Sequence, residues 1–264
     1  MISMKPDAPV GVFDSGVGGI SVLSALRAEL PGEDYIYYGD TLHAPYGTRS
    51  SDEVCELAEN VFLHLAGKGC KAVVIACNTA TAAAAAYLRK KYSGYPILGM
   101  EPALKPAALH REHGSILVLA TPTTLRLGKF RHLMDQYGEA AVPVPCPGLM
   151  ELVEKQDRAE QEAYLKRLLD PWSAEQIDAV VLGCTHYTFL IPILRRILPA
   201  SVKLYDGNAG TARQLRRVLT QADLINPRTE SGSVAVESSD PDPQVIAVMK
   251  SLLEEASAAY EKGT

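Results

Sequence analysis

The chain has 264 residues, of which 47% are hydrophobic and 22% charged, and its formal net charge is -5. At roughly 100 to 200 residues per domain, this length predicts one or two domains with a sizeable core. The acidic balance argues against nucleic-acid binding, and no apolar run approaches the roughly 20 residues that span a bilayer. The first residues carry no secretory pattern, so we expect a cytoplasmic protein without a membrane segment.

Short apolar runs rich in β-branched residues alternate with longer helical patterns along the chain. The predicted strands cover residues 10–13, 35–38, 72–76, 97–99, 116–120, 179–183 and 203–205. The predicted helices cover residues 20–30, 51–68, 79–92, 123–137, 160–169 and 209–222. Alternation of this kind predicts an α/β fold with largely parallel sheets flanked by helices.

The last segment, residues 241–260, is predicted to form a terminal helix that docks on the rest of the protein. Asp240 is its candidate N-cap, and Pro241 occupies the first helical position. The helical spacing predicts a buried stripe formed by Val245, Val248, Leu252 and Ala256.

Two segments far apart in the chain resemble each other. Residues 71–79 and residues 178–186 both form an apolar strand that ends in a cysteine, and residues 10–15 match residues 116–121 at nearly the same offset. The match predicts two copies of one unit, related by a pseudo-two-fold axis with the active site in the cleft between them. We assign residues 1–100 with 208–264 to the first lobe and residues 101–207 to the second.

Five cysteines occur in the chain, and their odd number in a long sequence argues for reduced thiols. We expect Cys55, Cys70 and Cys146 to be small core residues. Cys77 and Cys184 are different, because each ends one of the two matching strands. Ligands of parallel sheets bind at this edge, where a following helix N-terminus lowers the pKa of a thiol.

Two thiols at equivalent strand ends suit acid–base chemistry at a carbon atom. One thiol removes a proton from one face of the carbon, and the other returns a proton to the opposite face. The reaction implied is a racemisation or epimerisation. Asn78, Thr79 and Thr185 are candidates to hold the carboxylate of a small zwitterionic substrate, Asp14 is a candidate for its ammonium group, and no cofactor signature is required.

The chain resembles the glutamate racemases of the aspartate/glutamate racemase family. The resemblance rests on VGVFDSGVGG at 10–19, YGDT at 38–41, PYG at 45–47, ACNTATA at 76–82 and LGCTHY at 182–187. It implies interconversion of L- and D-glutamate by 1,1-proton transfer without pyridoxal phosphate or metal, which supplies D-glutamate for peptidoglycan. We also expect a homodimer.

The resemblance assigns roles to individual residues. Cys77 is the base for D-glutamate and is assisted by Asp14. Cys184 is the base for L-glutamate and is assisted by His186 and a glutamate, for which Glu154 aligns best and Glu151 is the competitor. The implied substrate contacts are Asp14, Ser15, Tyr46, Gly47, Asn78, Thr79, Thr185 and His186.

Four alternatives compete with this assignment. A racemase of aspartate or another acidic amino acid would use the same two thiols. A two-lobed amino-acid-binding protein would need the cleft but not both cysteines. A thiol–disulfide oxidoreductase would carry a close Cys-x-x-Cys pair, which this sequence lacks. Cys184 and His186 could ligate a metal, but no further Cys/His cluster at zinc spacing accompanies them.

Overall fold

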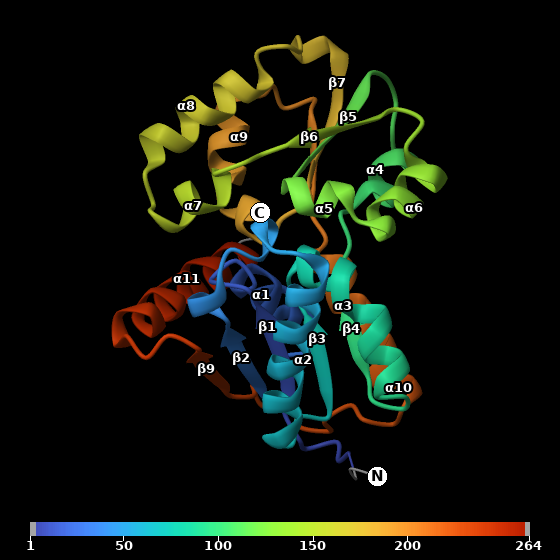
Figure 1. The fold of residues 1–264 in the computed structure, drawn as a ribbon, viewed down its shortest axis with the longest axis vertical. Helices are drawn as coiled ribbons and strands as arrows, with labels where there is room; N and C mark the ends of the chain where they lie inside the picture. Colours follow the sequence, from blue (N-terminus) through green and yellow to red (C-terminus); the bar gives the residue numbers. More distant parts are fainter. Residues whose placement is uncertain (1–3, 262–264) are drawn as a thin grey trace. The chain divides into compact units, whose positions relative to one another are not determined.

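The computed structural model describes residues 4–261 and consists of two compact units. The chain forms the first unit up to Met100, forms the second from Glu101 to Gly207, and returns to the first unit from Asn208 onward. Each unit contains one parallel sheet with helices on both faces (Figure 1). The predicted α/β class with parallel sheets flanked by helices is confirmed.

The first unit contains a five-stranded sheet in the order β4-β3-β1-β2-β9. Its strands are β1 (Val10–Asp14), β2 (Tyr35–Gly39), β3 (Ala72–Ile75), β4 (Ile97–Gly99) and β9 (Val234–Ser238). Its helices are α1 (Ile20–Glu29), α2 (Ser51–Gly67), α3 (Asn78–Lys91), α10 (Asn208–Gln221) and α11 (Pro243–Glu261), and two short 3-10 turns follow β2, η1 (Thr41–His43) and η2 (Tyr46–Thr48).

The second unit contains a four-stranded sheet in the order β6-β5-β7-β8. Its strands are β5 (Ser115–Ala120), β6 (Ala141–Pro145), β7 (Ile177–Leu182) and β8 (Lys203–Tyr205). Its helices are α4 (Leu104–Leu109), α5 (Pro122–Arg126), α6 (Gly128–Tyr137), α7 (Leu149–Glu154), α8 (Arg158–Leu169) and α9 (Ile191–Ile197), with the 3-10 turns η3 (Ala174–Gln176) and η4 (Thr185–Leu190).

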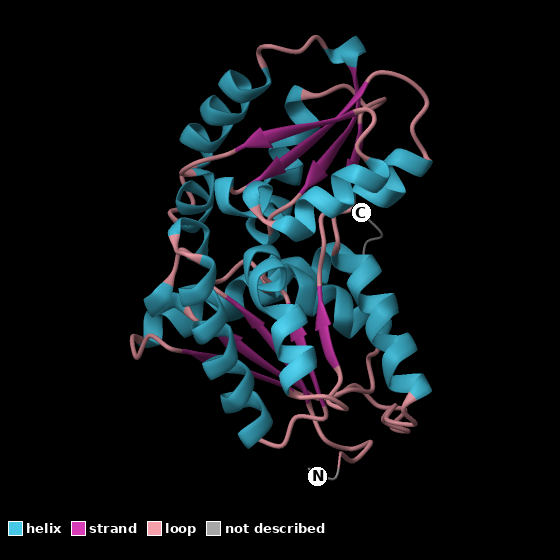
Figure 2. Cartoon of the chain, turned by 45° about the vertical axis from the view of Figure 1, so that its right-hand side comes forward, coloured by secondary structure: helices cyan, strands magenta, loops and turns pink. Residues whose placement is uncertain are grey.

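The two sheets repeat one topology. The first four strands of the first unit, β1 to β4, lie side by side in the order β4-β3-β1-β2. The four strands of the second unit, β5 to β8, lie in the corresponding order β8-β7-β5-β6. The first unit adds β9 next to β2, in parallel register. Within each unit the strands run side by side between helical layers (Figure 2). This equivalence makes β1 the counterpart of β5, and β3 the counterpart of β7.

The central strands are apolar throughout because both faces of each sheet are covered. In the first unit, Val10 and Val12 pack on the face that α1, α10 and α11 cover, whereas Phe13 packs on the opposite face with α2 and α3. In the second unit, Leu117 belongs to the cluster with α7 to α9, and Val118 to the cluster with α4 and α6. Burial on both faces explains why the strands read as continuous hydrophobic runs.

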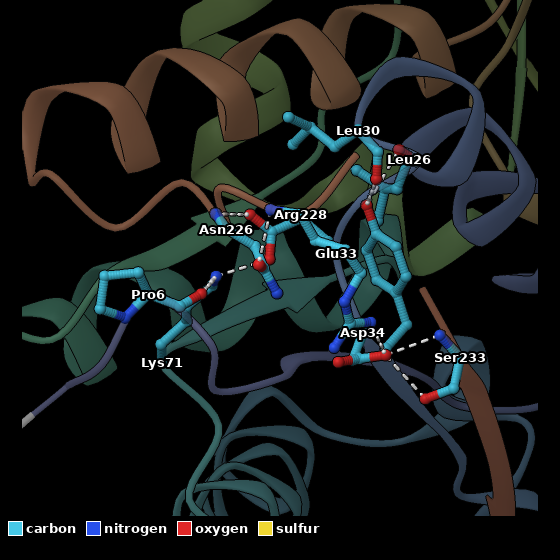
Figure 3. A network of polar contacts seen from close by, with 10 residues as sticks. Pro6, Leu26, Leu30, Glu33, Asp34, Lys71, Asn226, Arg228 and Ser233 are labelled. Carbon is cyan, nitrogen blue, oxygen red and sulfur yellow. Dashed lines mark hydrogen bonds and ion pairs between the residues drawn. The ribbon is translucent and has the colours of Figure 1, made fainter. Parts of the chain in front are cut away.

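A buried ion pair lies at the beginning of β3, at the end of the strand opposite Cys77. The Lys71 Nζ lies 2.5 Å from Glu33 Oε2, and it also donates to the Pro6 carbonyl. Glu33 Oε1 accepts from the Asn226 backbone N–H at 2.9 Å (Figure 3). Burial lowers the pKa of Lys71. The pair joins the start of β3 to the segment that leads into β2 and to the returning chain before β9.

Three expectations about secondary structure are wrong. The predicted helix 123–137 is broken at Leu127, which has extended backbone angles, and α6 begins at Gly128. The terminal helix begins at Pro243 and not at Pro241. Of the predicted stripe, Val245 and Leu252 pack against the core, whereas Val248 is 38% exposed and its neighbour Met249 is buried instead.

Other elements were not predicted. The strands β6 and β9 both lie at sheet edges, where they are only partly buried, and β6 contains two prolines that an edge strand tolerates. The short helices α4, α7 and α9 have too few turns for a clear periodicity. Within residues 4–261, no helix has the length and apolar character to cross a membrane.

Candidate active site

Cys77 follows β3 at the carboxyl edge of the first sheet. At this edge the backbone of β1 binds the segments that follow its two neighbouring strands, β3 and β2. Ala76 N–H donates to the Phe13 carbonyl at 2.8 Å, and Asp40 N–H donates to the Asp14 carbonyl at 2.9 Å. Three strand ends therefore meet at this edge, carrying Asp14 from β1, Asp40 from β2 and Cys77 from β3.

Cys184 occupies the equivalent place in the second sheet. Gly183 N–H donates to the Leu119 carbonyl at 2.7 Å, and Cys146 N–H donates to the Ala120 carbonyl at 3.0 Å. These are the counterparts of the two bonds that β1 accepts in the first unit. Each central strand, β1 or β5, therefore has one candidate catalytic thiol at the end of a neighbouring strand. The second unit has Cys146 at the position where the first unit has Asp40.

The Cys77 thiol is the N-cap of α3. Its sulfur accepts from the Ala80 backbone N–H at 3.4 Å and lies 3.7 Å from Ser15 Oγ. The side chain is 6% exposed. The N-terminus of a helix carries partial positive charge, which stabilises negative charge on a group placed there. Cys77 is therefore held in surroundings that suit a proton-transferring thiol.

Asp14 is fully buried at the end of β1. Its Oδ1 accepts from the Gly16 backbone N–H at 2.9 Å, so the carboxylate closes the turn between β1 and α1. Gly19 makes this turn possible, because a Cβ at that position would come within 2.6 Å of the Asp14 Cβ. The glycine-rich segment after β1 therefore serves the close packing of a carboxylate next to Cys77.

Asn78 presents a buried side-chain amide directly after Cys77. The side chain is 5% exposed, and neither its Oδ1 nor its Nδ2 has a hydrogen-bond partner among residues 4–261. A buried amide without partners costs free energy, so native proteins pair such groups in nearly all cases. Because Asn78 directly follows Cys77, a polar ligand at this thiol would satisfy its amide. Ser15, which follows β1, and Thr79, in the first turn of α3, are also buried.

The Cys184 thiol has a different partner. It precedes the 3-10 turn η4, and its sulfur accepts no capping bond from the described part of the chain. Instead, Cys184 Sγ lies 3.8 Å from His186 Nδ1, and His186 Nε2 lies 3.0 Å from Glu154 Oε1. Thr185 and His186 are buried in η4.

Glu154, at the end of α7, makes the contact to His186, whereas Glu151 lies one turn earlier in the same helix. The Glu154 side chain is 32% exposed. A carboxylate on one ring nitrogen fixes the tautomer and orientation of an imidazole, and it stabilises the protonated ring. The arrangement couples the thiol, the imidazole and the carboxylate in series.

Tyr46 and Gly47 lie in η2, after β2. The Tyr46 ring is buried in the hydrophobic cluster that contains Phe13 and Cys77, and its hydroxyl donates to Asp40 Oδ2 at 2.5 Å. Burial, followed by the hydrogen bond to Asp40, raises the pKa of Tyr46. The first unit therefore brings Tyr46 to the same strand ends as Cys77 and Asp14.

Of the three cysteines predicted to be core residues, Cys70 and Cys146 are buried and Cys55 is only partly buried. Cys70 and Cys146 are buried among hydrophobic side chains, and burial raises the pKa of each thiol to about 12. Cys55 is partly exposed on α2, and burial again raises its pKa. These thiols remain protonated at neutral pH and are poor bases. Among residues 4–261 no group of three His, Cys, Asp or Glu side chains is placed to hold a metal ion.

Two groups at these edges were missed from the sequence. Thr121, Thr123 and Thr124 are buried at the end of β5, where the match between Ser15 and Thr121 was an available signal. Thr121 Oγ1 accepts from the Thr124 backbone N–H at 3.2 Å and so caps α5. Asp40 was missed although it lies within the YGDT motif, because only the fold brings it next to Asp14.

The two units share one strand order, and each carries a buried cysteine after the equivalent strand. The family model described as Asp/Glu/Hydantoin racemase matches residues 20–215, and the chain belongs to this family. A glutamate racemase of Clostridium perfringens is 44% identical over 252 residues, which cover 94% of this chain and 97% of that protein.

Solved structures agree with this assignment. The glutamate racemase isoform RacE1 of Bacillus anthracis has a TM-score of 0.84 at 29% identity and covers 94% of both chains. The glutamate racemase of Francisella tularensis, solved in complex with D-glutamate, has a TM-score of 0.80 at 27% identity and also covers 94% of both chains.

Proposed function

We propose that this protein is a glutamate racemase that interconverts L- and D-glutamate by a two-thiol, 1,1-proton transfer without a cofactor. The observation that carries the proposal is the equivalence of the thiols: Cys77 and Cys184 follow the same strand of two sheets that share one topology. A single catalytic thiol would not need a counterpart in the repeated unit. Two thiols are what inversion at one carbon requires, because the proton leaves one face and arrives at the other.

The proposed reaction begins with removal of the α-proton by one thiolate, which leaves the bonding electron pair on the α-carbon. The other thiol donates its proton to the opposite face, and the stereocentre is inverted. We assign Cys77 as the base for D-glutamate and Cys184 as the base for L-glutamate. The two thiols exchange protonation states in each turnover, so reversal of the reaction restores them.

The neighbours of each thiol support these roles. Asp14 is buried at the end of β1, the strand that pairs with β3, which Cys77 follows. A carboxylate there can bind the ammonium group of an amino acid or assist proton transfer. His186, held by Glu154 at 3.0 Å, is placed to exchange a proton with Cys184. General acid–base groups of this kind contribute about 10²- to 10⁴-fold to a rate.

Substrate binding is proposed to use Ser15, Asn78 and Thr79 in the first unit and Thr185 and His186 in the second, together with the turn at Tyr46 and Gly47. The Asn78 amide is the strongest support, since its buried donor and acceptor are both available to a polar ligand. Carboxylate and ammonium groups of a zwitterion match this set of donors and acceptors.

Glutamate is favoured over aspartate by the relatives. Proteins 41% to 47% identical over most of the chain are glutamate racemases. The aspartate racemase of Picrophilus torridus is 16% identical with a TM-score of 0.60, and this likeness concerns the fold alone. We further propose that the D-glutamate formed serves peptidoglycan synthesis and cell shape, and that the protein acts as a homodimer.

The proposal is tested with protein dialysed against EDTA and assayed without pyridoxal phosphate. L-glutamate, D-glutamate and L-aspartate are supplied separately, and each product is resolved by chiral chromatography. We expect both glutamate isomers to reach the same racemic mixture, with aspartate turned over far more slowly. Preference for aspartate would contradict the substrate assignment, and dependence on an added cofactor would contradict the mechanism.

A further inference from the structure

We propose that Asp40 is a positioning residue of the racemase, which holds the Tyr46–Gly47 turn in place beside Cys77. The inference rests on the proposed function and adds a residue that does not itself touch the reacting carbon. Asp40 and its two side-chain partners, His43 and Tyr46, are called the Asp40 clamp below.

Both oxygens of the Asp40 carboxylate are occupied. Oδ2 accepts from the Tyr46 hydroxyl at 2.5 Å, and Oδ1 lies 2.7 Å from His43 Nδ1. The Asp40 side chain is 3% exposed, whereas that of His43 is 46% exposed. Hydrogen bonds to an ionised carboxylate are short and roughly twice as strong as neutral ones. The clamp therefore fixes η2 to the end of β2.

The position of Asp40 is itself fixed by the strand that carries Asp14. Asp40 N–H donates to the Asp14 carbonyl at 2.9 Å, so the clamp and the buried Asp14 share one backbone contact. The loop between Asp40 and Tyr46 is further supported by the end of β9 and the residue after it. Thr41 Oγ1 lies 2.7 Å from Ser238 Oγ, and Leu42 N–H donates to Ser239 Oγ at 3.0 Å.

The direction of the Tyr46 hydrogen bond limits what this tyrosine can do. A phenol has one proton, and Tyr46 gives it to Asp40, so the hydroxyl offers only lone pairs to any other group. A negatively charged substrate group near η2 is then bound through the backbone N–H groups of the turn. Because the Asp40 clamp fixes the location of that turn, the affinity for substrate also depends on the clamp.

The clamp belongs to the Cys77 half of the protein. At the equivalent strand end in the described second unit stands Cys146, whose thiol donates to the Val144 carbonyl at 3.3 Å. The buttressing strand β9 likewise has no counterpart among residues 101–207. The Asp40 carboxylate and the strand β9 that supports its loop therefore occur together in the first unit, which favours a specific role for Asp40 in that unit.

The test is a double-mutant cycle on racemisation of glutamate with Asp40→Ala, Tyr46→Phe and the double variant, plus Asp40→Asn. Asp40→Ala and Tyr46→Phe should each raise KM about tenfold, the loss expected for one hydrogen bond to a charged group, with a smaller change in kcat. The double variant should be no worse than the poorer single variant. Asp40→Asn keeps one acceptor oxygen and should recover part of the affinity.

Tyr87→Phe is the matched control, because it removes an exposed tyrosine-to-carboxylate bond of 2.8 Å to Glu59 on the helical surface. It should keep the wild-type KM. Multiplicative losses in the double variant, or a lowered melting temperature and kcat with unchanged KM, would overturn the clamp. If the wild type racemises glutamate and the variants keep the wild-type KM, the clamp is contradicted and the proposed function stands. If the wild type does not racemise glutamate, both the proposed function and the clamp are overturned.

Discussion

The Cys77 and Cys184 halves share a backbone plan but support their thiols by different chemistry. Cys77 caps a 14-residue helix and accepts a backbone N–H, with the buried Asp14 beside it. Cys184 precedes a 3-10 turn and relies on His186, which is held by Glu154. The comparison teaches that the fold fixes where a thiol stands, while the few residues after the strand decide which group shares its proton.

The same contrast occurs at the opposite ends of the two cysteine strands. Lys71 directly precedes β3 and pairs with Glu33. The aligned residue Asp178 lies in β7 and accepts from the backbone N–H groups of Glu112 and His113, both at 3.1 Å. Both side chains are buried. A duplicated strand therefore tolerates opposite charges at one position when each unit supplies its own partners.

The largest expected effect is loss of either thiol. Cys77→Ser and Cys184→Ser should each reduce racemisation by about 10³-fold, since a hydroxyl is a far weaker acid–base group than a thiol in these surroundings. The measurement is the initial rate from each glutamate isomer. Cys55→Ser, a partly exposed cysteine of α2, is the control and should keep the wild-type rate. A near-normal rate in either active-site variant would remove the symmetry between the halves.

The next largest effect concerns folding stability. Lys71→Met leaves Glu33 charged and buried without its partner, and breaking such a pair costs about 3 kcal/mol or more. Urea unfolding should show this loss. Lys71→Met combined with Glu33→Leu should regain most of it, because no unpaired charge remains. A double variant as unstable as the single one would show that packing, and not the unpaired carboxylate, sets the cost.

A smaller effect is expected at the imidazole that supports Cys184. His186→Asn should lower the rate about 10²-fold, and Glu154→Gln about tenfold, because the glutamate acts through the histidine. Glu151→Gln, one turn earlier in α7, is the matched control. Equal losses in the Glu151 and Glu154 variants would refute the assignment of the carboxylate, and the measurement is kcat/KM from L-glutamate.

The smallest effect is a pH dependence confined to the first unit, where Asp34 joins β2 to the segment before β9. The hydrogen bond from Arg228 lowers the pKa of Asp34 from its ordinary 3.8 to about 2. A carboxyl with a lowered folded-state pKa stabilises the protein above pH 3.8, and this contribution disappears as the pH falls toward 2. The stability difference between wild type and Asp34→Asn should therefore be constant above pH 5 and shrink on acidification. An unchanged difference at pH 3 would contradict this account.

Much of the fold follows from the sequence because the buried strands carry a strong signal. The run from Val10 to Phe13 and the matching cysteine strands indicate a parallel sheet without further information. The edge strand β6 gives no such signal, since its prolines and partial burial hide it. Val248 of α11 was wrongly predicted to be buried because Val248 and Met249 are both apolar, and only packing against α1 decides which one is buried.

The site is predictable in part for a similar reason. Cys77 and Cys184 stand in repeated motifs, so the sequence alone singles them out from five cysteines. Asp40 has no equivalent carboxylate in the second unit. Its proposed role rests on contacts with Tyr46 and with Asp14 that form only on folding. From the sequence, only the family resemblance singles out Glu154 from the other glutamates, and its contact with His186 depends on where α7 lies in the fold.

The most direct test of the two-thiol account is deuterium exchange at the α-carbon in D₂O, followed by NMR for L- and D-glutamate separately. The wild type should incorporate solvent deuterium from both isomers, with label appearing first in the isomer formed. Cys77→Ser should lose proton removal from D-glutamate, and Cys184→Ser should lose it from L-glutamate. If one variant still exchanges both isomers at the wild-type rate, a single thiol serves both faces and the account is wrong.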